Sequence, residues 1–275
     1  MPINSTDEYR RTKDRARARL EHALTGNAEV LRLINENQAG WSLNLFQEAG
    51  EASGSFHSSF PREPIPQRGT GTDKARSQEE ASRRARSQIR RYCAHNRLNR
   101  LGTLTFKGEG CHDPLQLRSH LSAFFVELRK AIGRDLPYLW VPEWHSTDHG
   151  LHVHFAVGRY IKRSVIEAAW PHGFVHIKIL GDLPHGSQDR DQARIAAGYL
   201  AKYVGKGLLD ERRIEGLHRY DLAQGFKPIA QRIFAPSRHE VITEAIERMG
   251  SPHKYLWDSN DDEGWQKPPA VYLSW

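Results

Sequence analysis

The chain of 275 residues is long enough for one substantial domain with extensions, and 38% hydrophobic residues suffice to build a core. No apolar run reaches the length that a bilayer requires, so we expect a cytoplasmic protein rather than a membrane-spanning or secreted one. Cys93 and Cys111 form no Cys-x-x-Cys pattern, which fits a reducing compartment. The net charge of +7 favours a polyanionic partner.

The first 72 residues are expected to lie outside the main domain. Residues 1–39 are predicted to form a helical appendage, since they hold a charged stretch behind a Ser or Thr cap and a short apolar stripe. Gly, Ser and Pro accumulate over 40–72, which predicts a flexible linker. The main domain is expected over 73–230, with 231–275 as a C-terminal extension that packs on it.

Basic side chains concentrate in a predicted helix over 73–100 and its exit. This segment holds nine Lys and Arg against three Asp and Glu, a difference of +6. A solvated helix face normally mixes both signs, whereas this one does not after Glu80, so contact with nucleic-acid phosphates is favoured over a solvated face. The arginines expected to make these contacts are Arg83, Arg84, Arg86, Arg90, Arg91, Arg97 and Arg100.

Hydrophobic periodicity then predicts an alternation of strands and helices. The expected elements are a strand at 101–107, a helix at 112–132, a hairpin of strands at 138–143 and 151–157, a helix at 162–170 and a strand at 173–180. This β-α-β-β-α-β order predicts an α+β fold of the ferredoxin-like (split βαβ) type. Its antiparallel sheet is expected to have strand 151–157 at the centre, helices on one face, and the other face free.

Weaker patterns follow this unit. A helix is expected at 189–206, a strand within 217–226, a helix at 238–249 and a terminal strand at 270–275.

The central feature of the pattern is the strand Leu151–Val157, where apolar residues alternate with His152 and His154. Alternation places both imidazoles on one sheet face, where they can bind a divalent metal ion. Glu143 on the adjacent hairpin strand is the expected third ligand and reaches the same face. A strand end in solvent is the alternative for Glu143. The histidines that could compete as ligands are His145, His149, His172 and His176.

A pair of tyrosines follows on the helix predicted at 189–206. Tyr199 and Tyr203 are four residues apart and therefore share a helix face. A tyrosine hydroxyl has a pKa near 10 and attacks a phosphodiester only where a metal neutralises the phosphate and a cation eases deprotonation. Lys202 and Lys206 are close enough in sequence to supply that cation. Two core aromatics on an amphipathic helix are the alternative.

Three motifs, in this order and on these elements, resemble those of the HUH endonucleases: Thr103-Leu-Thr-Phe106, His152-Val-His154 and Tyr199-x-x-Lys202-Tyr203-x-x-Lys206. Within that superfamily the chain is similar to the two-tyrosine rolling-circle replication initiators of single-stranded-DNA phages and related plasmids, over residues 73 to 230. Two further segments resemble initiators of actinobacterial mobile elements: 83–106, with Arg90-Arg-Tyr92, and Arg219-Tyr-x-x-x-x-Gly-Phe226.

The resemblance implies metal-dependent nicking of one strand of a single-stranded or hairpin origin DNA, with Mg²⁺ or Mn²⁺ as cofactor. A 5′-phosphotyrosine would store the bond energy, a 3′-OH would prime a polymerase, and rejoining would follow. Single-tyrosine relatives keep the second position of the pair, which implies that Tyr203 initiates and Tyr199 terminates. The chain has no Gly-x-x-x-x-Gly-Lys-Ser/Thr loop, so a separate helicase from the host or the element is expected as a partner.

Three other functions compete with this hypothesis. A transposase or relaxase would use the same chemistry. A non-catalytic binder of single-stranded DNA or RNA would use the open sheet and the basic helix without cutting. A zinc-stabilised structural domain is disfavoured by the lack of paired cysteines.

Overall fold

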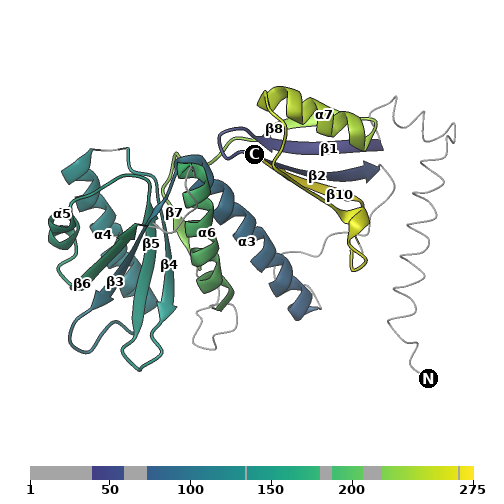
Figure 1. Ribbon diagram of the computed structural model, residues 1–275. Helices are drawn as coiled ribbons and strands as arrows, with labels where there is room; N and C mark the ends of the chain where they lie inside the picture. The colour runs from purple at the N-terminus through teal and green to yellow at the C-terminus, as the bar shows by residue number, and fades with distance from the viewer. Residues whose placement is uncertain (1–38, 59–72, 134, 180–187, 207–218, 266) are drawn as a thin grey trace, which may run out of the picture. The chain divides into compact units, whose positions relative to one another are not determined.

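The protein is a mixed α+β structure with two antiparallel sheets and, in the described part of the chain, five α-helices (Figure 1). The structure is a computed structural model that describes residues 39–58, 73–133, 135–179, 188–206, 219–265 and 267–275. The chain divides into two compact units. We call Pro66–Pro228 the motif unit, and the described residues of 1–65 and 229–275 together the outer unit.

The motif unit contains the predicted alternation of strands and helices. Its elements are α3 (Lys74–Asn96), β3 (Arg100–Phe106), α4 (Pro114–Ile132), β4 (Tyr138–Trp144), β5 (Leu151–Val157), α5 (Arg163–Ala169), β6 (Gly173–Ile179), α6 (Asp189–Lys206) and β7 (Asp221–Leu222). The sheet order is β6-β3-β5-β4-β7, and all neighbouring strands are antiparallel. The histidine strand β5 is therefore central, as predicted, while the strand expected within 217–226 is reduced to β7.

Local capping fixes where the two long helices begin and end. The Asp73 carboxylate accepts a hydrogen bond from the backbone N–H of Arg76 and starts α3. Arg97 ends the same helix in the left-handed conformation, with φ 54°. Asp113 caps α4 through the N–H of Leu115, and Pro114 occupies the first turn, where its missing N–H costs no hydrogen bond.

Both faces of the motif sheet pack against helices. On one face, Val153 and Phe155 of β5 join a core with residues of α4 and α5. On the opposite face, Ala156 packs in a second core with Ala196 and Leu200 of α6 and with residues of α3. The prediction of one helix-free face is therefore wrong for this part of the sheet. The small side chains of α6 let that helix approach the sheet closely, a long-range contact that periodicity does not predict.

A close approach between β3 and β5 fixes the central strand. A Cβ atom at Gly102 would lie 2.2 Å from the ring of Phe155, its cross-strand neighbour. Glycine is the residue that leaves room for this ring at that position. The Phe155 ring in turn contacts the rings of Phe124 and Phe125 of α4. The strand that carries both candidate ligands is thus anchored from its opposite face.

The outer unit is a second sheet with one helix. Its elements are β1 (Ala39–Phe46), β2 (Glu51–Ser58), β8 (Gln231–Ala235), α7 (Arg238–Met249), β9 (Tyr255–Asp258), a 3-10 turn (Ser259–Asp261) and β10 (Ala270–Ser274). The sheet order is β8-β1-β2-β10-β9. Val241 and Ala245 of α7 pack in its core. The helix at 238–249 and the terminal strand are as predicted, whereas β8 and β9 were not predicted.

The prediction of a flexible linker over 40–72 is wrong for residues 40–58. Trp41, Leu43 and Leu45 alternate along β1 and are buried, and β2 pairs with β1 throughout. The Ser and Gly residues of β2 suggested a linker, but they pair as a strand because larger side chains of β1 supply the core. Residues 231–275 group with these strands in the outer unit instead of extending the motif unit. Residues 1–38, which make up nearly all of the predicted appendage, lie outside the described residues.

No helix in the described part of the chain is both long and apolar enough to cross a membrane.

Candidate metal and tyrosine site

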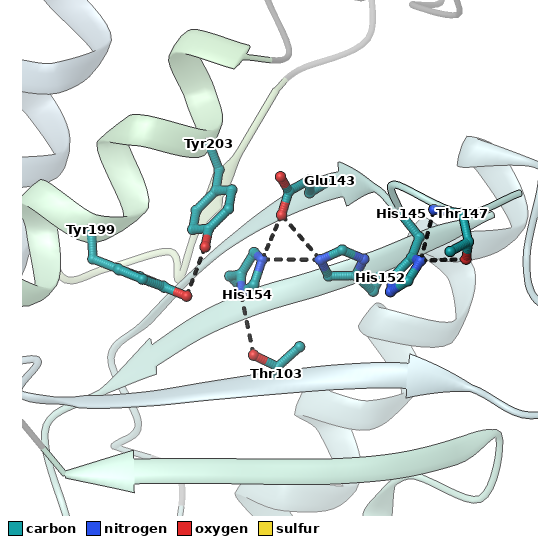
Figure 2. Close-up of polar contacts among 8 residues, drawn as sticks. All are labelled: Thr103, Glu143, His145, Thr147, His152, His154, Tyr199 and Tyr203. Atoms are coloured by element: carbon teal, nitrogen blue, oxygen red, sulfur yellow. Dashed lines mark hydrogen bonds and ion pairs between the residues drawn. The ribbon is translucent and has the colours of Figure 1, made fainter. Parts of the chain in front are cut away.

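The β4–β5 hairpin brings two histidines and a glutamate together. Glu143 stands directly across from His152 in the strand register, and His154 lies two residues further along the same face of β5. The Oε2 atom of Glu143 is 2.9 Å from His154 Nε2 and 3.1 Å from His152 Nε2, and the two Nε2 atoms are 3.1 Å apart (Figure 2). The three residues predicted as metal ligands thus point one atom each at a common position.

The spacing and the chemistry of these atoms fit a divalent metal ion. Two ligand atoms at right angles, each about 2.1 Å from an ion, are about 3.0 Å apart, which is the edge of an octahedral site. The three distances of 2.9, 3.1 and 3.1 Å match that edge. Two imidazole nitrogens with one carboxylate oxygen suit Mn²⁺ better than Mg²⁺, because Mg²⁺ prefers oxygen ligands. His152 Nδ1 is buried without a hydrogen-bond partner.

Thr103 fixes the orientation of His154. Its Oγ1 lies 3.2 Å from His154 Nδ1, from the directly paired position on β3. Metal binding through Nε2 requires the proton to be on Nδ1, and that N–H then donates to the threonine hydroxyl. Thr103 belongs to the first of the three sequence motifs, but no role was predicted for it. The signal available was its place on the face of a strand next to the histidine strand.

The two tyrosines of α6 lie beside His154. The Tyr203 ring stacks on the His154 ring, with centroids 3.9 Å apart and planes 19° from parallel. The Tyr203 hydroxyl donates a hydrogen bond of 2.7 Å to the Tyr199 hydroxyl (Figure 2). Tyr203 is 9% exposed and Tyr199 42%. Both hydroxyls thus lie next to the candidate ligands, one sheltered and one accessible.

The surroundings change the proton affinity of two of these groups. Burial, with a contribution from the nearby His154, lowers the pKa of His152 below its ordinary value, so its imidazole stays neutral and able to bind a metal. Burial, the hydrogen bond to Tyr199 and the charge of Glu143 raise the pKa of Tyr203. Without a bound cation, therefore, the Tyr203 phenolate is strongly disfavoured.

The described contacts do not test the roles predicted for the two lysines of the tyrosine motif. Lys202 is exposed. Lys206 is the last residue of α6, and its side chain lies outside the described part of the structure. A role for either lysine at the tyrosines therefore remains a prediction.

The predicted DNA-binding arginines lie on α3 and its exit. Arg83, Arg84 and Arg86 are exposed, and Arg83 forms an ion pair with Glu80. Helix α3 packs against α6. A Cβ atom added at Gly205 of α6 would lie 3.6 Å from the guanidinium of Arg86.

The remaining four arginines are partly buried: Arg90, Arg91, Arg97 and Arg100. Arg97 bonds to the carbonyl of Ala94, and Arg100 donates to Asn99 Oδ1. Phosphate binding by the arginines of α3 remains a prediction.

In the described part of the chain, the histidines considered as competing ligands are not among the residues whose ligand atoms converge. The His145 ring is 5.4 Å from that of His152, and its Nδ1 pairs with the Thr147 hydroxyl. His149 Nε2 bonds to the Phe106 carbonyl. His172 lies against His120 of α4, with ring centroids 3.9 Å apart, a pair that sequence reasoning missed. His176 is exposed on β6.

Residues 99–208 match the family model described as "Replication-associated protein ORF2/G2P". The matched segment begins just before β3 and ends just after α6, so it includes the candidate metal ligands, both tyrosines of α6 and Thr103. No curated protein and no solved structure matches the chain. The family match supports a rolling-circle replication initiator family for the segment that carries the candidate site.

Proposed function

We propose that the protein nicks and rejoins one DNA strand at a replication origin through a 5′-phosphotyrosine intermediate, in a metal-dependent reaction that starts rolling-circle replication. The observation that carries the proposal is the stacking of Tyr203 on His154, which places two tyrosine hydroxyls beside three convergent ligand atoms. The family match over the same residues supports a role in replication initiation.

The proposed reaction transfers a DNA phosphate from a 3′ oxygen to a tyrosine oxygen, so the energy of the phosphodiester bond is kept in the phosphotyrosine. A divalent ion held by Glu143, His152 and His154 would neutralise charge on the non-bridging phosphate oxygens. A tyrosine oxygen attacks phosphorus, a Tyr–O–P bond forms, and the bond from phosphorus to the 3′ oxygen breaks. The tyrosine loses its proton and the departing oxygen gains one as a 3′-OH. A later attack by a 3′-OH on the phosphotyrosine reverses these changes and rejoins the strand.

Two adjacent hydroxyls permit successive transfers within one site. The 2.7 Å hydrogen bond between them supports the idea that Tyr199 and Tyr203 can reach the same phosphate in turn. We assign initiation to Tyr203 and termination to Tyr199. While one tyrosine holds the 5′ end, the other cuts the regenerated origin after a full circle. Lys202 and Lys206 are proposed to stabilise the phenolate or phosphate charge.

The remaining parts of the proposal concern the fold and its partners. The element order β-α-β-β-α-β and the strand order β6-β3-β5-β4 support a ferredoxin-like arrangement with the histidine strand central. The partners that we propose are single-stranded or hairpin origin DNA, bound in part by the arginines of α3, together with a separate helicase and a polymerase in the cytoplasm.

Two alternative functions differ from this proposal, one in the DNA that it acts on and the other in the lack of catalysis. A transposase or relaxase would use the same groups and differ in its DNA target. A binder without catalysis needs neither convergent ligand atoms nor paired hydroxyls, and both are present here. The site therefore favours an enzyme over a binding module.

A covalent adduct assay tests the proposal. The protein is incubated with Mn²⁺ and a labelled pool of randomised single-stranded oligonucleotides, and a denaturing gel detects protein–DNA adducts, whose sequences identify the origin. We expect adducts with the wild-type protein and none with His152→Ala or His154→Ala. The matched control is His112→Ala, which removes an exposed histidine outside the site. Absence of adducts from the wild-type protein, or cleavage after exhaustive chelation, would contradict the proposal.

A further inference from the structure

The edge strand β6 presents an uncovered row of side chains. Phe174, His176 and Lys178 alternate along one face of this strand, and all three are exposed. Phe174 is 71% exposed, an unusual state for a phenylalanine in a regular strand. β6 lies at the edge of the motif sheet, away from α6 and α3 (Figure 1). We call these three residues the β6 row.

The β6 row shares a sheet face with the candidate metal ligands. Thr103 pairs with His176 on one side and with His154 on the other, so these three residues form a line across three strands. Thr105, two residues further along β3, pairs with Phe174 of β6. Neighbouring strands are about 4.8 Å apart, which places the row about 10 Å from the histidine strand.

Helices cover only the other part of this face. Leu101, Val141 and Ala156 pack beneath α3 and α6, whereas no residue of the β6 row belongs to a described core cluster. Neither β3 nor β6 contains a carboxylate, and Lys178 adds a positive charge. The surface next to the site is therefore partly aromatic and without acidic groups on its two strands.

We propose that the β6 row binds unpaired nucleotides flanking the phosphate that is cut. In this arrangement the Phe174 ring stacks on one base and Lys178 contacts a backbone phosphate. The hydroxyls of Thr103 and Thr105 face the DNA where it crosses from β6 toward the candidate metal ligands. Stacking on an aromatic ring accepts any base, because every base has a π face. The inference rests on the proposed function and adds the path of the substrate strand across the sheet.

The first test measures binding separately from cutting. Anisotropy of a labelled oligothymidylate is recorded with chelated protein that carries Tyr199→Phe and Tyr203→Phe, so no adduct forms. We expect Phe174→Ala to weaken binding about tenfold, the effect of losing one stacked base, and Phe174→Trp to retain it. The control is Tyr160→Ala, which removes an aromatic ring of closely similar exposure, 72%, from the segment between β5 and α5. Equal affinities for Phe174→Ala and Tyr160→Ala would overturn the proposal.

The second test concerns charge and strandedness. Lys178→Gln should reduce the slope of log affinity against log salt by about 0.7, the value for one phosphate contact on single-stranded DNA. Lys130→Gln on α4, which packs on the opposite sheet face, should leave the slope unchanged. An unchanged slope for Lys178→Gln, or an equal loss of duplex binding in Phe174→Ala, overturns the proposal.

The two proposals fail separately. If the wild-type protein forms adducts while Phe174→Ala binds normally, only the β6 row is excluded. If no adduct forms but Phe174→Ala binds more weakly, the row binds single strands and the nicking function is excluded.

Discussion

The hydroxyl of Thr103 contacts His154 Nδ1 and so orients the ring with Nε2 toward the other two candidate ligands. Replacing it by Val keeps the shape of the side chain but removes the acceptor for the Nδ1 proton. We expect Thr103→Val to lower the affinity for Mn²⁺ about 10- to 100-fold, as for other residues that orient a ligand. Calorimetric titration measures this, and Thr103→Ser should restore binding. The control, Thr105→Val, removes the next hydroxyl on the same face of β3; an equal loss there would contradict the assignment.

Gly102 is the residue at which a single methyl group should disturb the site. A Cβ there would lie 2.2 Å from the Phe155 ring, so Gly102→Ala forces β3 and β5 apart. We expect a loss of about 1 to 3 kcal/mol in the free energy of unfolding.

The matched control for Gly102→Ala is Gly198→Ala on α6, where no atom lies within 4 Å of the added methyl. It should stabilise the protein by about 0.5 to 1 kcal/mol, because alanine favours a helix. Urea denaturation measures both variants. A Gly102→Ala protein as stable as the wild type would show that β5 is not anchored through Phe155.

At the scale of elements, helix α6 holds both tyrosines, to which we assign different steps of the reaction. Tyr203→Phe should lose most of the initial nicking of a single-stranded origin, because we assign the first attack to Tyr203. Tyr199→Phe should still nick but fail to terminate and recycle, and the double variant should form no adduct. Mass spectrometry of the phosphotyrosyl peptide identifies the attacking residue. A first-turnover adduct found only on Tyr199, the more exposed of the two, would reverse the assignment.

Helix α3 is expected to contribute affinity without sequence preference. Neutralising Arg83, Arg84, Arg90 and Arg91 together should weaken binding to all DNA sequences and reduce the salt slope by close to one unit per lost phosphate contact. Binding isotherms at several salt concentrations give the slope. If the slope does not change, α3 is a solvated helix whose charges serve solubility.

The sequence predicted those parts of the motif unit that depend on neighbouring residues. Alternation in β5 placed His152 and His154 on one face, and the short hairpin put Glu143 in register with them. The helix at 189–206 was predicted, but its packing over part of that face was not, because the contacts of Ala193, Ala196 and Ala197 with β4 and β5 join residues far apart in the sequence. The role of Thr103 was missed for a similar reason, since it depends on which strands become neighbours.

At the scale of the whole molecule, the motif unit should work alone. Residues 66–228 contain both cores of that unit and every candidate catalytic residue, so we expect this fragment to fold and to form the covalent adduct. Thermal unfolding and the adduct assay test this. A folded fragment without activity would show that the outer unit contributes to the site. Deleting residues 1–70 from the full chain is a poorer test, because it removes β1 and β2 from the middle of the outer sheet.

The outer unit is built from chain segments that precede and follow the motif unit in the sequence. This sets the order in which its strands can pair during synthesis. β1 and β2 leave the ribosome first, but β8 and β10, which pair with their outer edges, follow only after the motif unit. At typical translation rates the hairpin waits about 10 to 30 s with both edges unpaired. Exposed edges invite pairing with other nascent chains. The Ser53-Gly54-Ser55 stretch of β2, which resembles a linker, lowers that risk, because small polar residues make a poor template for aggregation.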